Sequence, residues 1–338
     1  MLVGRQSWSF ERKPVIISTG TAVGPDEGAG PLGRSFDKVF PDTKMDEKTW
    51  EKAEKKLMET AAQEAVKKSG VPADSINFYV GGDLLNQIIS SSFAARTLEI
   101  PYVGIFGACS TSMEGLALSS LMISSGAATY ALAGTCSHNC TVEKQFRYPT
   151  EYGAQKPPTA QFTVTGAGAA VLAAQGQGPR ISRATMGKVI DMGIKDPFNM
   201  GAAMAPAAVN TIEAHFREFA LQPDEYDLII TGDLASVGHE IAKELFKQHT
   251  FPIDKINFQD CGLLVYDRNK QDVQAGGSGC GCSAVVTYGH LLQQLEQGKL
   301  NRILVVATGA LLSPLSYQQG ETIPCIAHAV AIESGRGN

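Results

Sequence analysis

Short apolar runs alternate with amphipathic stretches along the first half of the chain. Residues 15–18, 77–80, 102–106 and 129–133 have the length and the apolar character of buried strands. Residues 113–124, between the last two of these runs, are predicted to form a helix. Because strands and helices alternate, the pattern predicts parallel sheets that are covered by helices on both faces.

A longer amphipathic helix is predicted between the first two strands. Apolar side chains recur at helical spacing from Trp50 to Ala65. Asp46 is expected to cap the start of this helix, because a short polar side chain can accept hydrogen bonds from the unpaired amides of a first turn. Two lysines followed by Gly70 are typical of a helix end.

The second half of the chain repeats this order of elements. Helices are predicted at residues 208–219, 236–247 and 283–297, and strands at residues 227–230, 263–266 and 302–307. In both halves a strand runs into Gly-Asp-Leu, which begins at residue 82 in the first half and at residue 232 in the second. This repetition predicts an internal duplication, and the Gly- and Pro-rich residues 175–179 divide the chain into halves of residues 1–177 and 178–338.

Composition and charge exclude several classes of protein. The chain has 338 residues, of which 43% are hydrophobic and 19% are charged, so it can bury a substantial core. Its net charge is −5, and we expect no nucleic-acid partner. Polar side chains interrupt the longest uncharged run, residues 115–142, so a buried helix followed by a buried strand explains it better than a membrane span. Residues 1–14 lack the apolar stretch of a signal peptide, and a soluble chain is therefore expected.

The seven cysteines are an odd number without the spacing of a secreted disulfide framework, which favours free thiols in a reducing compartment. Cys136 and Cys140 have a spacing that zinc sites use, whereas Cys280 and Cys282 are too close together for an ordinary zinc knuckle. We expect no metal site at these cysteines, because the second pair lies among glycines where small size is the simpler requirement.

The most informative cysteine is Cys109. The strand at residues 102–106 leads through Gly107 and Ala108 to this cysteine at the start of a helix, and Ser110 and Thr111 follow it. Unpaired amides at a helix N-terminus stabilise an anion, which predicts a lowered thiol pKa or a binding place for a ligand carboxylate. The structural alternative is a buried cysteine that packs as a small apolar side chain.

At this elbow the chain resembles the thiolase superfamily, which includes the ketoacyl synthases, and the resemblance covers essentially the whole chain. It implies an α/β fold of two βαβαβαββ halves in five αβαβα layers, with a nucleophilic cysteine at the position of Cys109. Five strings of residues are similar to the stage V sporulation protein AD family, a thiolase-like family of spore-forming bacteria: residues 82–87, 106–114, 137–139, 145–153 and 276–286.

The groups that condensing enzymes use beside the nucleophile are missing from the expected positions. Such enzymes stabilise a carbanion or enolate with His and His or Asn, or with a second Cys. The resemblance places the histidine at residues 232–233, where Gly and Asp stand, and the asparagine at Ser278. The second cysteine would fall in residues 308–312, which contain none.

These differences favour a non-enzymatic binding protein over an enzyme. The resemblance implies that its ligand is dipicolinic acid or the calcium chelate of this acid, taken up into the developing spore during sporulation, with calcium carried by the ligand and no other cofactor. It also implies other stage V sporulation A-type membrane proteins as partners, peripheral association with the spore inner membrane, and a homodimer. The alternative is an acyltransferase or condensing enzyme of the ketoacyl synthase type that uses Cys109 with a relocated histidine, and a scaffold with a vestigial pocket is a third candidate.

A pyridine dicarboxylate needs donors for two carboxylates and a flat slot for its ring. The helix start at Cys109, Ser110 and Thr111, and a second one at Asp83, are expected to supply backbone amides. Arg147 or Lys156 can supply the counter-charge.

Four further candidates have a structural alternative. Asp83 or Asp233 can face the calcium ion, or each can cap the helix that follows it. His138 follows a strand end, where α/β folds bind ligands, and His328 lies near the last strand. Each histidine is a candidate for the site or a structural histidine whose ring nitrogens are satisfied by the core.

Overall fold

The computed structural model describes residues 1–146 and 156–335, and its strands form two groups with the same order. In the first group β9 lies antiparallel between β3 and β7, and β7, β5 and β6 run parallel. In the second group β15 lies antiparallel between β10 and β14, and β14, β11 and β12 run parallel. The repeated order confirms the internal duplication. The first group comprises β3 (Val15–Val23), β5 (Phe78–Asp83), β6 (Tyr102–Gly104), β7 (Tyr130–Ser137) and β9 (Gly166–Ala173). The second comprises β10 (Arg180–Thr185), β11 (Leu228–Thr231), β12 (Phe258–Asp260), β14 (Arg302–Ala310) and β15 (Cys325–Glu333).

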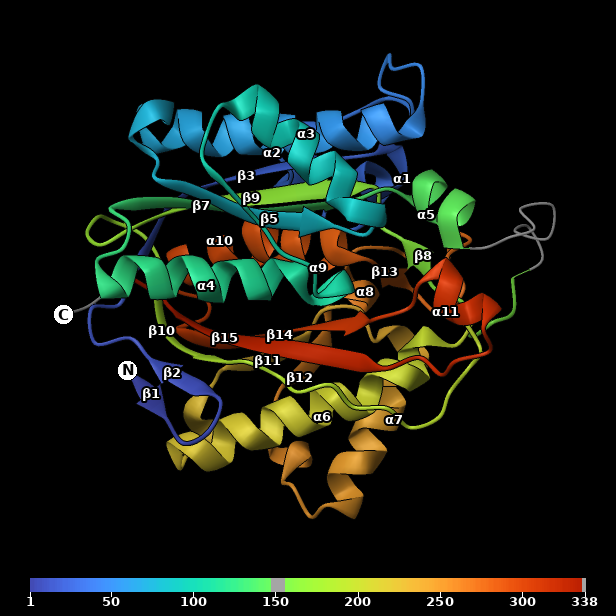
Figure 1. Cartoon of the computed structure of the whole chain (residues 1–338). Helices are drawn as coiled ribbons and strands as arrows, with labels where there is room; N and C mark the ends of the chain where they lie inside the picture. Colours follow the sequence, from blue (N-terminus) through green and yellow to red (C-terminus); the bar gives the residue numbers. More distant parts are fainter. Residues whose placement is uncertain (147–155, 336–338) are drawn as a thin grey trace.

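Helices cover both groups of strands and fill the space between them, which makes five layers (Figure 1). The outer helices of the first group are α2 (Trp50–Ser69) and α3 (Ile89–Leu98), and those of the second group are α6 (Met200–Phe219) and α7 (Ala235–Gln248). The central layer contains α4 (Thr111–Ser125), α9 (Cys280–Val286), the π-helical turn at Thr287–Leu291 and α10 (Leu292–Glu296). This is the five-layer αβαβα architecture that the resemblance implies.

The remaining elements are short. The helices among them are α1 (Pro25–Ala29), α5 (Asn139–Phe146), α8 (Cys261–Leu264) and α11 (Pro314–Gln318). The strands are β1 (Leu2–Val3), β2 (Ser7–Ser9), β4 (Lys38–Val39), β8 (Phe162–Thr163) and β13 (Gly277–Ser278). Because β2 pairs with β10, the first residues of the chain extend the strands of the second group. The division of the chain at residues 177 and 178 stays a prediction.

Small residues allow the central helices to lie directly on the strands. Every residue of β9 and of α9 is buried. A Cβ atom at Gly168 of β9 would lie 3.0 Å from the backbone of Ala284 of α9 and 2.8 Å from the ring of Tyr288. The closeness of these layers gives a physical reason for the abundance of small residues, since larger ones would push strand and helix apart.

Two predictions from the pattern were wrong. The long helix begins after Thr49, whose hydroxyl accepts a hydrogen bond from the Lys52 amide at 3.3 Å, and not at Asp46. Asp42 closes a separate turn before it by accepting a hydrogen bond from the Met45 amide at 2.7 Å. Residues 263–266, predicted as a strand, begin within α8, and the strand of this region is the preceding β12. An apolar run of four residues cannot distinguish a strand from a turn of helix, so packing decides.

The long uncharged run forms the buried α4 and the buried β7, as predicted. Among residues 1–146 and 156–335, no helix combines the length and the apolar character that a membrane crossing requires.

Candidate functional site

A strained turn places Cys109 at the start of α4. Ala108 has a φ of 50°, a left-handed conformation that is unfavourable for alanine and that neighbouring hydrogen bonds hold in place. The Ser110 hydroxyl donates to the carbonyl of Gly107 at 2.6 Å, and the Thr111 hydroxyl donates to the carbonyl of Ala108 at 2.7 Å. Both hydroxyl side chains are buried, they hold the elbow through these bonds, and neither lines the pocket that Cys109 faces.

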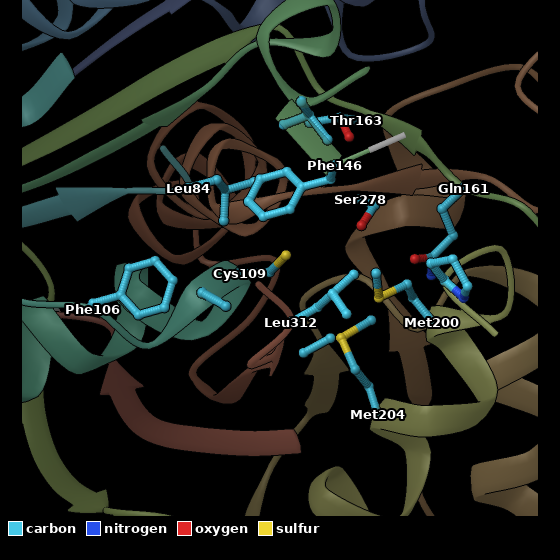
Figure 2. Close-up of a pocket in the computed structure, with 14 residues that line it drawn as sticks. Leu84, Phe106, Cys109, Phe146, Gln161, Thr163, Met200, Met204, Ser278 and Leu312 are labelled. Carbon is cyan, nitrogen blue, oxygen red and sulfur yellow. The ribbon is translucent and has the colours of Figure 1, made fainter. Parts of the chain in front are cut away.

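Cys109 faces a mostly apolar pocket between the two halves (Figure 2). The pocket has an empty volume of about 620 Å³, part of which is open to solvent. Aromatic side chains contribute from the end of β6 and from α5, and methionines contribute from α6. The lining residues are Leu84, Phe106, Ala108, Cys109, Val142, Phe146, Gln161, Thr163, Pro197, Met200, Met204, Ser278, Ala310 and Leu312.

A buried carboxyl group lies behind the cysteine. Asp233 follows β11, and its carboxyl group lies close to the Cys109 thiol. Its Oδ2 atom accepts a hydrogen bond from the Ser278 hydroxyl at 3.0 Å and another from the Gly279 amide at 3.1 Å. Its Oδ1 atom accepts one from the Thr308 hydroxyl. The carboxyl group is thus enclosed by protein donors, at the place where the resemblance expects a catalytic histidine.

The predicted lowering of the Cys109 pKa was wrong. Burial raises the pKa of this thiol well above its ordinary value, and the nearby Asp233 carboxylate raises it further. Burial also raises the pKa of Asp233, although its hydrogen-bond donors act in the opposite direction. The helix N-terminus alone suggested a stabilised thiolate, but the second half of the chain brings a negative charge to the same sulfur.

Gly309 packs so closely against the elbow that this position has no room for a side chain. A Cβ atom at residue 309 would lie 2.2 Å from the carbonyl oxygen of Gly107 and 3.2 Å from the amide nitrogen of Cys109. The end of β14 therefore packs directly against the backbone of the elbow. Any side chain at residue 309 would displace Cys109.

Asp83, the counterpart of Asp233 in the first half, has a different role. Its buried carboxylate accepts hydrogen bonds from the amides of Leu85 at 2.9 Å and Ser91 at 2.7 Å. Burial raises its pKa to about 6. Asp83 holds the turn that leads into α3, but the N-cap position of that helix is Ile88, which has no side-chain cap. Asp83 does not line the pocket around Cys109.

The two candidate histidines use their ring nitrogens within the protein. The His138 Nε2 atom lies 2.7 Å from the carbonyl oxygen of Thr43, and its Nδ1 atom accepts a hydrogen bond from the Cys140 amide at 3.1 Å. The His328 Nδ1 atom accepts one from the Gly187 amide at 3.2 Å. Burial lowers the pKa of His138, and it lowers that of His328 to about 4. Both rings lie outside the pocket lining, as the structural alternative expects.

The expected counter-charges lie elsewhere or outside the described part of the chain. Arg147 is not among the described residues. The Lys156 ammonium lies 2.8 Å from a Glu143 carboxylate oxygen and 5.4 Å from the ring centre of Phe162, and Lys156 does not line the pocket. Of the predicted ligand-binding residues within the described part of the chain, the structure brings Cys109 and Asp233 together, and Cys109 alone lines the pocket.

Several pocket residues were not identified from the sequence. Gln161 lies before β8, and its Nε2 atom donates to the main-chain oxygen of Asp233 at 2.6 Å. Thr163, Met200 and Phe146 line the same pocket. They come from distant parts of the chain without a shared motif, so only the folded structure associates them with Cys109.

Within the described residues, the pocket lining contains no imidazole and no charged side chain. A second thiol, that of Cys280, lies in the same small cluster as Ala108 and Cys109, but it donates a hydrogen bond to the carbonyl of Cys136 at 2.9 Å. The described residues also contain no group of three or more His, Cys, Asp or Glu side chains that could hold a metal ion.

Comparison with known proteins identifies the family. The model of the stage V sporulation protein AD family matches residues 4–333. Stage V sporulation protein AD of Bacillus subtilis (strain 168) is 53% identical over 336 residues, which cover 99% of each chain. The chain belongs to the stage V sporulation protein AD family.

Solved structures show that this sporulation family has a thiolase-like fold. 3-Oxoacyl-[acyl-carrier-protein] synthase III of Aquifex aeolicus VF5 superimposes with a TM-score of 0.58 at 14% identity, covering 95% of this chain and 99% of that one. A variant of OleA from Xanthomonas campestris superimposes with a TM-score of 0.61 at 14% identity, covering 96% and 99%. At this level of identity the likeness establishes the fold, and the chemistry must be argued from the site itself.

Proposed function

We propose that this member of the stage V sporulation protein AD family binds dipicolinic acid as its calcium chelate in the pocket beside Cys109, without transforming it. The ligand is the one that the family resemblance implies. The observation that carries the proposal is the Asp233 carboxyl group behind Cys109, which protein donors enclose at the place where the resemblance expects a catalytic histidine. A pocket whose described lining has a thiol but no imidazole is better suited to holding a molecule than to condensing two.

The electrostatics of the pocket favour the chelate over the free acid. Dipicolinate carries two negative charges, and the described lining offers no cation to balance them. Burying this dianion near the Asp233 carboxylate would add charge repulsion to the cost of desolvation. In the calcium chelate the metal ion cancels both charges, so an uncharged ligand enters a mostly apolar site.

The shape of the lining also suits a flat ring. Phe106 and Phe146 line the pocket near Cys109, and the polar atoms of Thr163, Gln161 and Ser278 lie along one side (Figure 2). Aromatic rings can stack on a pyridine, and a small number of polar groups can orient its carboxylates. We expect Phe106 to stack on the ring of the ligand, because its side chain lines the pocket and is 48% exposed.

Calorimetry tests this proposal with three ligands. Dipicolinate with equimolar calcium is expected to bind, whereas dipicolinate with a chelator of calcium is expected to bind far more weakly. Benzene-1,3-dicarboxylate with calcium is the matched control, because it has the same outline but lacks the ring nitrogen that completes the chelate. The absence of heat with dipicolinate and calcium would refute the proposal, and equal binding with the calcium chelator would identify the free acid as the ligand.

A pair of variants tests the location of the ligand. Phe106→Ala is expected to raise the Kd about fivefold, because a stacked aromatic contact contributes about 1 kcal/mol. Phe93→Ala removes a similarly exposed ring, 44% exposed, that does not line this pocket, and it should leave the Kd unchanged. Equal weakening by both substitutions would place the ligand elsewhere.

Acyl transfer by Cys109 is the second candidate function. The methionines and leucines of the lining favour it, because an apolar wall can also hold an acyl chain. Incubation with acyl-CoA followed by mass spectrometry of the intact protein separates the two functions. A stable acyl adduct that disappears in Cys109→Ala would support the enzyme, and an unmodified protein that still binds the chelate would support the binding function.

A further inference from the structure

The carboxyl group behind Cys109 occurs where a condensing enzyme needs a proton acceptor for the thiol. Asp233 is 1% exposed, and both its oxygens accept hydrogen bonds from protein donors on two segments, residues 278–279 and Thr308. Gly279 precedes α9, Ser278 belongs to β13, and Thr308 belongs to β14. An arrangement in which every partner is a donor stabilises an ionised carboxylate at a fixed position.

The Cys109 thiol lies close to this carboxyl group. Thr308, which donates to Asp233, is followed by Gly309, whose backbone packs against the amide of Cys109. A thiolate would therefore place a second negative charge beside the first in a site of low dielectric. The other titratable groups that face Cys109 are the thiols of Cys280 and Cys282, both on α9. Among the described residues, no cation contributes to the environment of this sulfur.

We propose that Asp233 is a positioning residue that keeps Cys109 in the uncharged thiol form, so that the elbow presents an unreactive sulfur to the ligand. The thiolate, and not the thiol, is the nucleophile in cysteine chemistry. In the thiol form the sulfur of Cys109 offers a neutral surface to the pocket. This inference rests on the proposed function, because it explains how a fold with a nucleophile elbow holds a ligand without reacting with it.

The opposite role for Asp233 makes a different prediction. As a general base, the carboxylate would remove the thiol proton and activate Cys109, as an imidazole does in a Cys–His pair. Removing its charge would then slow every reaction of the sulfur. Under our proposal the same substitution accelerates these reactions, because a repulsive charge beside the thiolate is lost. The sign of the effect therefore decides between the two roles.

The rate at which iodoacetamide alkylates Cys109 in the folded protein shows whether replacing Asp233 accelerates or slows the reactions of the sulfur. The thiolate displaces iodide from the reagent, the thiol proton goes to the buffer, and the product at Cys109 is quantified by mass spectrometry of its peptide. In the unaltered protein the rate should continue to rise beyond pH 9, since an ordinary thiol has a pKa of about 8.5. In Asp233→Asn the rate at pH 8 should increase roughly tenfold for each unit by which the thiol pKa falls.

Asp260→Asn is the matched control. Asp260 is also buried, and its carboxylate accepts hydrogen bonds from the amides of Leu234 at 2.8 Å and Ala235 at 2.9 Å. It is not among the groups that shift the pKa of Cys109, so its replacement should not accelerate alkylation. Circular dichroism of both variants identifies the folded samples to be compared.

Three results would overturn the proposal: a slower reaction in Asp233→Asn, an unchanged rate in that variant, or a plateau below pH 8.5 in the unaltered protein. The last measurement needs no variant, so it decides the matter even where Asp233→Asn does not fold. Failure of the calcium chelate to bind would refute the proposed function but would leave the alkylation rates unaffected. The two proposals can therefore fail independently.

Discussion

Glu27 is a buried carboxyl that links the two halves of the molecule. This residue of α1 accepts hydrogen bonds through Oε1 from the Thr165 amide at 2.8 Å and from the Tyr266 hydroxyl. Its Oε2 atom is buried without a hydrogen-bond partner, and burial raises its pKa to about 7. The folded protein thus holds this proton at pH values where the unfolded chain has released it.

We expect stability to fall as the pH rises through this range. The carboxyl of the unfolded chain ionises near its ordinary pKa of 4.5, and that of the folded protein ionises near 7. Between these values the free energy of unfolding should decrease by about 2–3 kcal/mol, and it should stay at the lower level above them. Glu27→Gln should remove this dependence, because the amide imitates the protonated acid.

Urea unfolding at pH 5 and pH 8 tests this expectation, with Glu11→Gln on the surface as the control. From pH 5 to pH 8, the free energy of unfolding of the unaltered protein should fall, whereas that of Glu27→Gln should not show this fall. A constant difference would mean that Glu27 is ionised in the folded protein throughout.

At the scale of the element, the start of α2 shows how tertiary packing selects a helix cap. Two residues were available, and the structure uses Thr49, while Asp46 adopts a φ of 61° in the preceding turn. The first buried apolar residue of the helix is Ala53, one turn after Thr49. The helix begins where its apolar face meets the strands, and the cap follows from that position.

We expect Thr49→Ala to lower the free energy of unfolding by about 1 kcal/mol, because the first turn loses its side-chain acceptor. Asp46→Gly is the control, since glycine tolerates the left-handed conformation of this residue. Urea unfolding of both variants provides the measurement. A larger loss of unfolding free energy in Asp46→Gly than in Thr49→Ala would indicate that Asp46 caps the helix.

At the scale of the whole molecule, β6 leaves one edge of the strands open. It pairs with β5 and has no strand on its other side among the described residues. Ile89 at the start of α3 and Phe106 just after β6 are 40% and 48% exposed. An unpaired edge with apolar neighbours can pair with the same edge of a second copy about a twofold axis. We propose that the homodimer implied by the family resemblance forms along β6.

Sedimentation velocity tests this proposal. The unaltered protein is expected to sediment as a dimer at micromolar concentration, and Ile89→Glu is expected to shift it towards the monomer because a charge would be buried in the interface. Leu315→Glu on α11, 64% exposed and far from β6 in the chain, should leave the dimer intact. A monomer at all concentrations, or equal dissociation by both substitutions, would contradict it.

The order of elements could be predicted from the sequence because each signal is local. Apolar periodicity identified the long α2 and the buried pair of α4 and β7, and the repeated Gly-Asp-Leu revealed the duplication. The five residue strings were sufficient for the family, since a resemblance over the whole chain does not depend on knowing any contact. The elbow that carries Cys109 could be predicted for the same reason, because strand, turn and helix are consecutive there.

The chemical state of that cysteine was decided only by the tertiary structure. The helix start next to Cys109 is visible in the sequence and favours a thiolate. Burial of the sulfur, and after it the Asp233 carboxylate from the other half, reverses the effect. His138 and His328 had suitable strand positions, yet the Thr43 carbonyl lies against Nε2 of His138 and the Gly187 amide donates to Nδ1 of His328. A pKa and the direction of a side chain depend on distances between segments that are remote in the chain, and such distances exist only once the layers have packed.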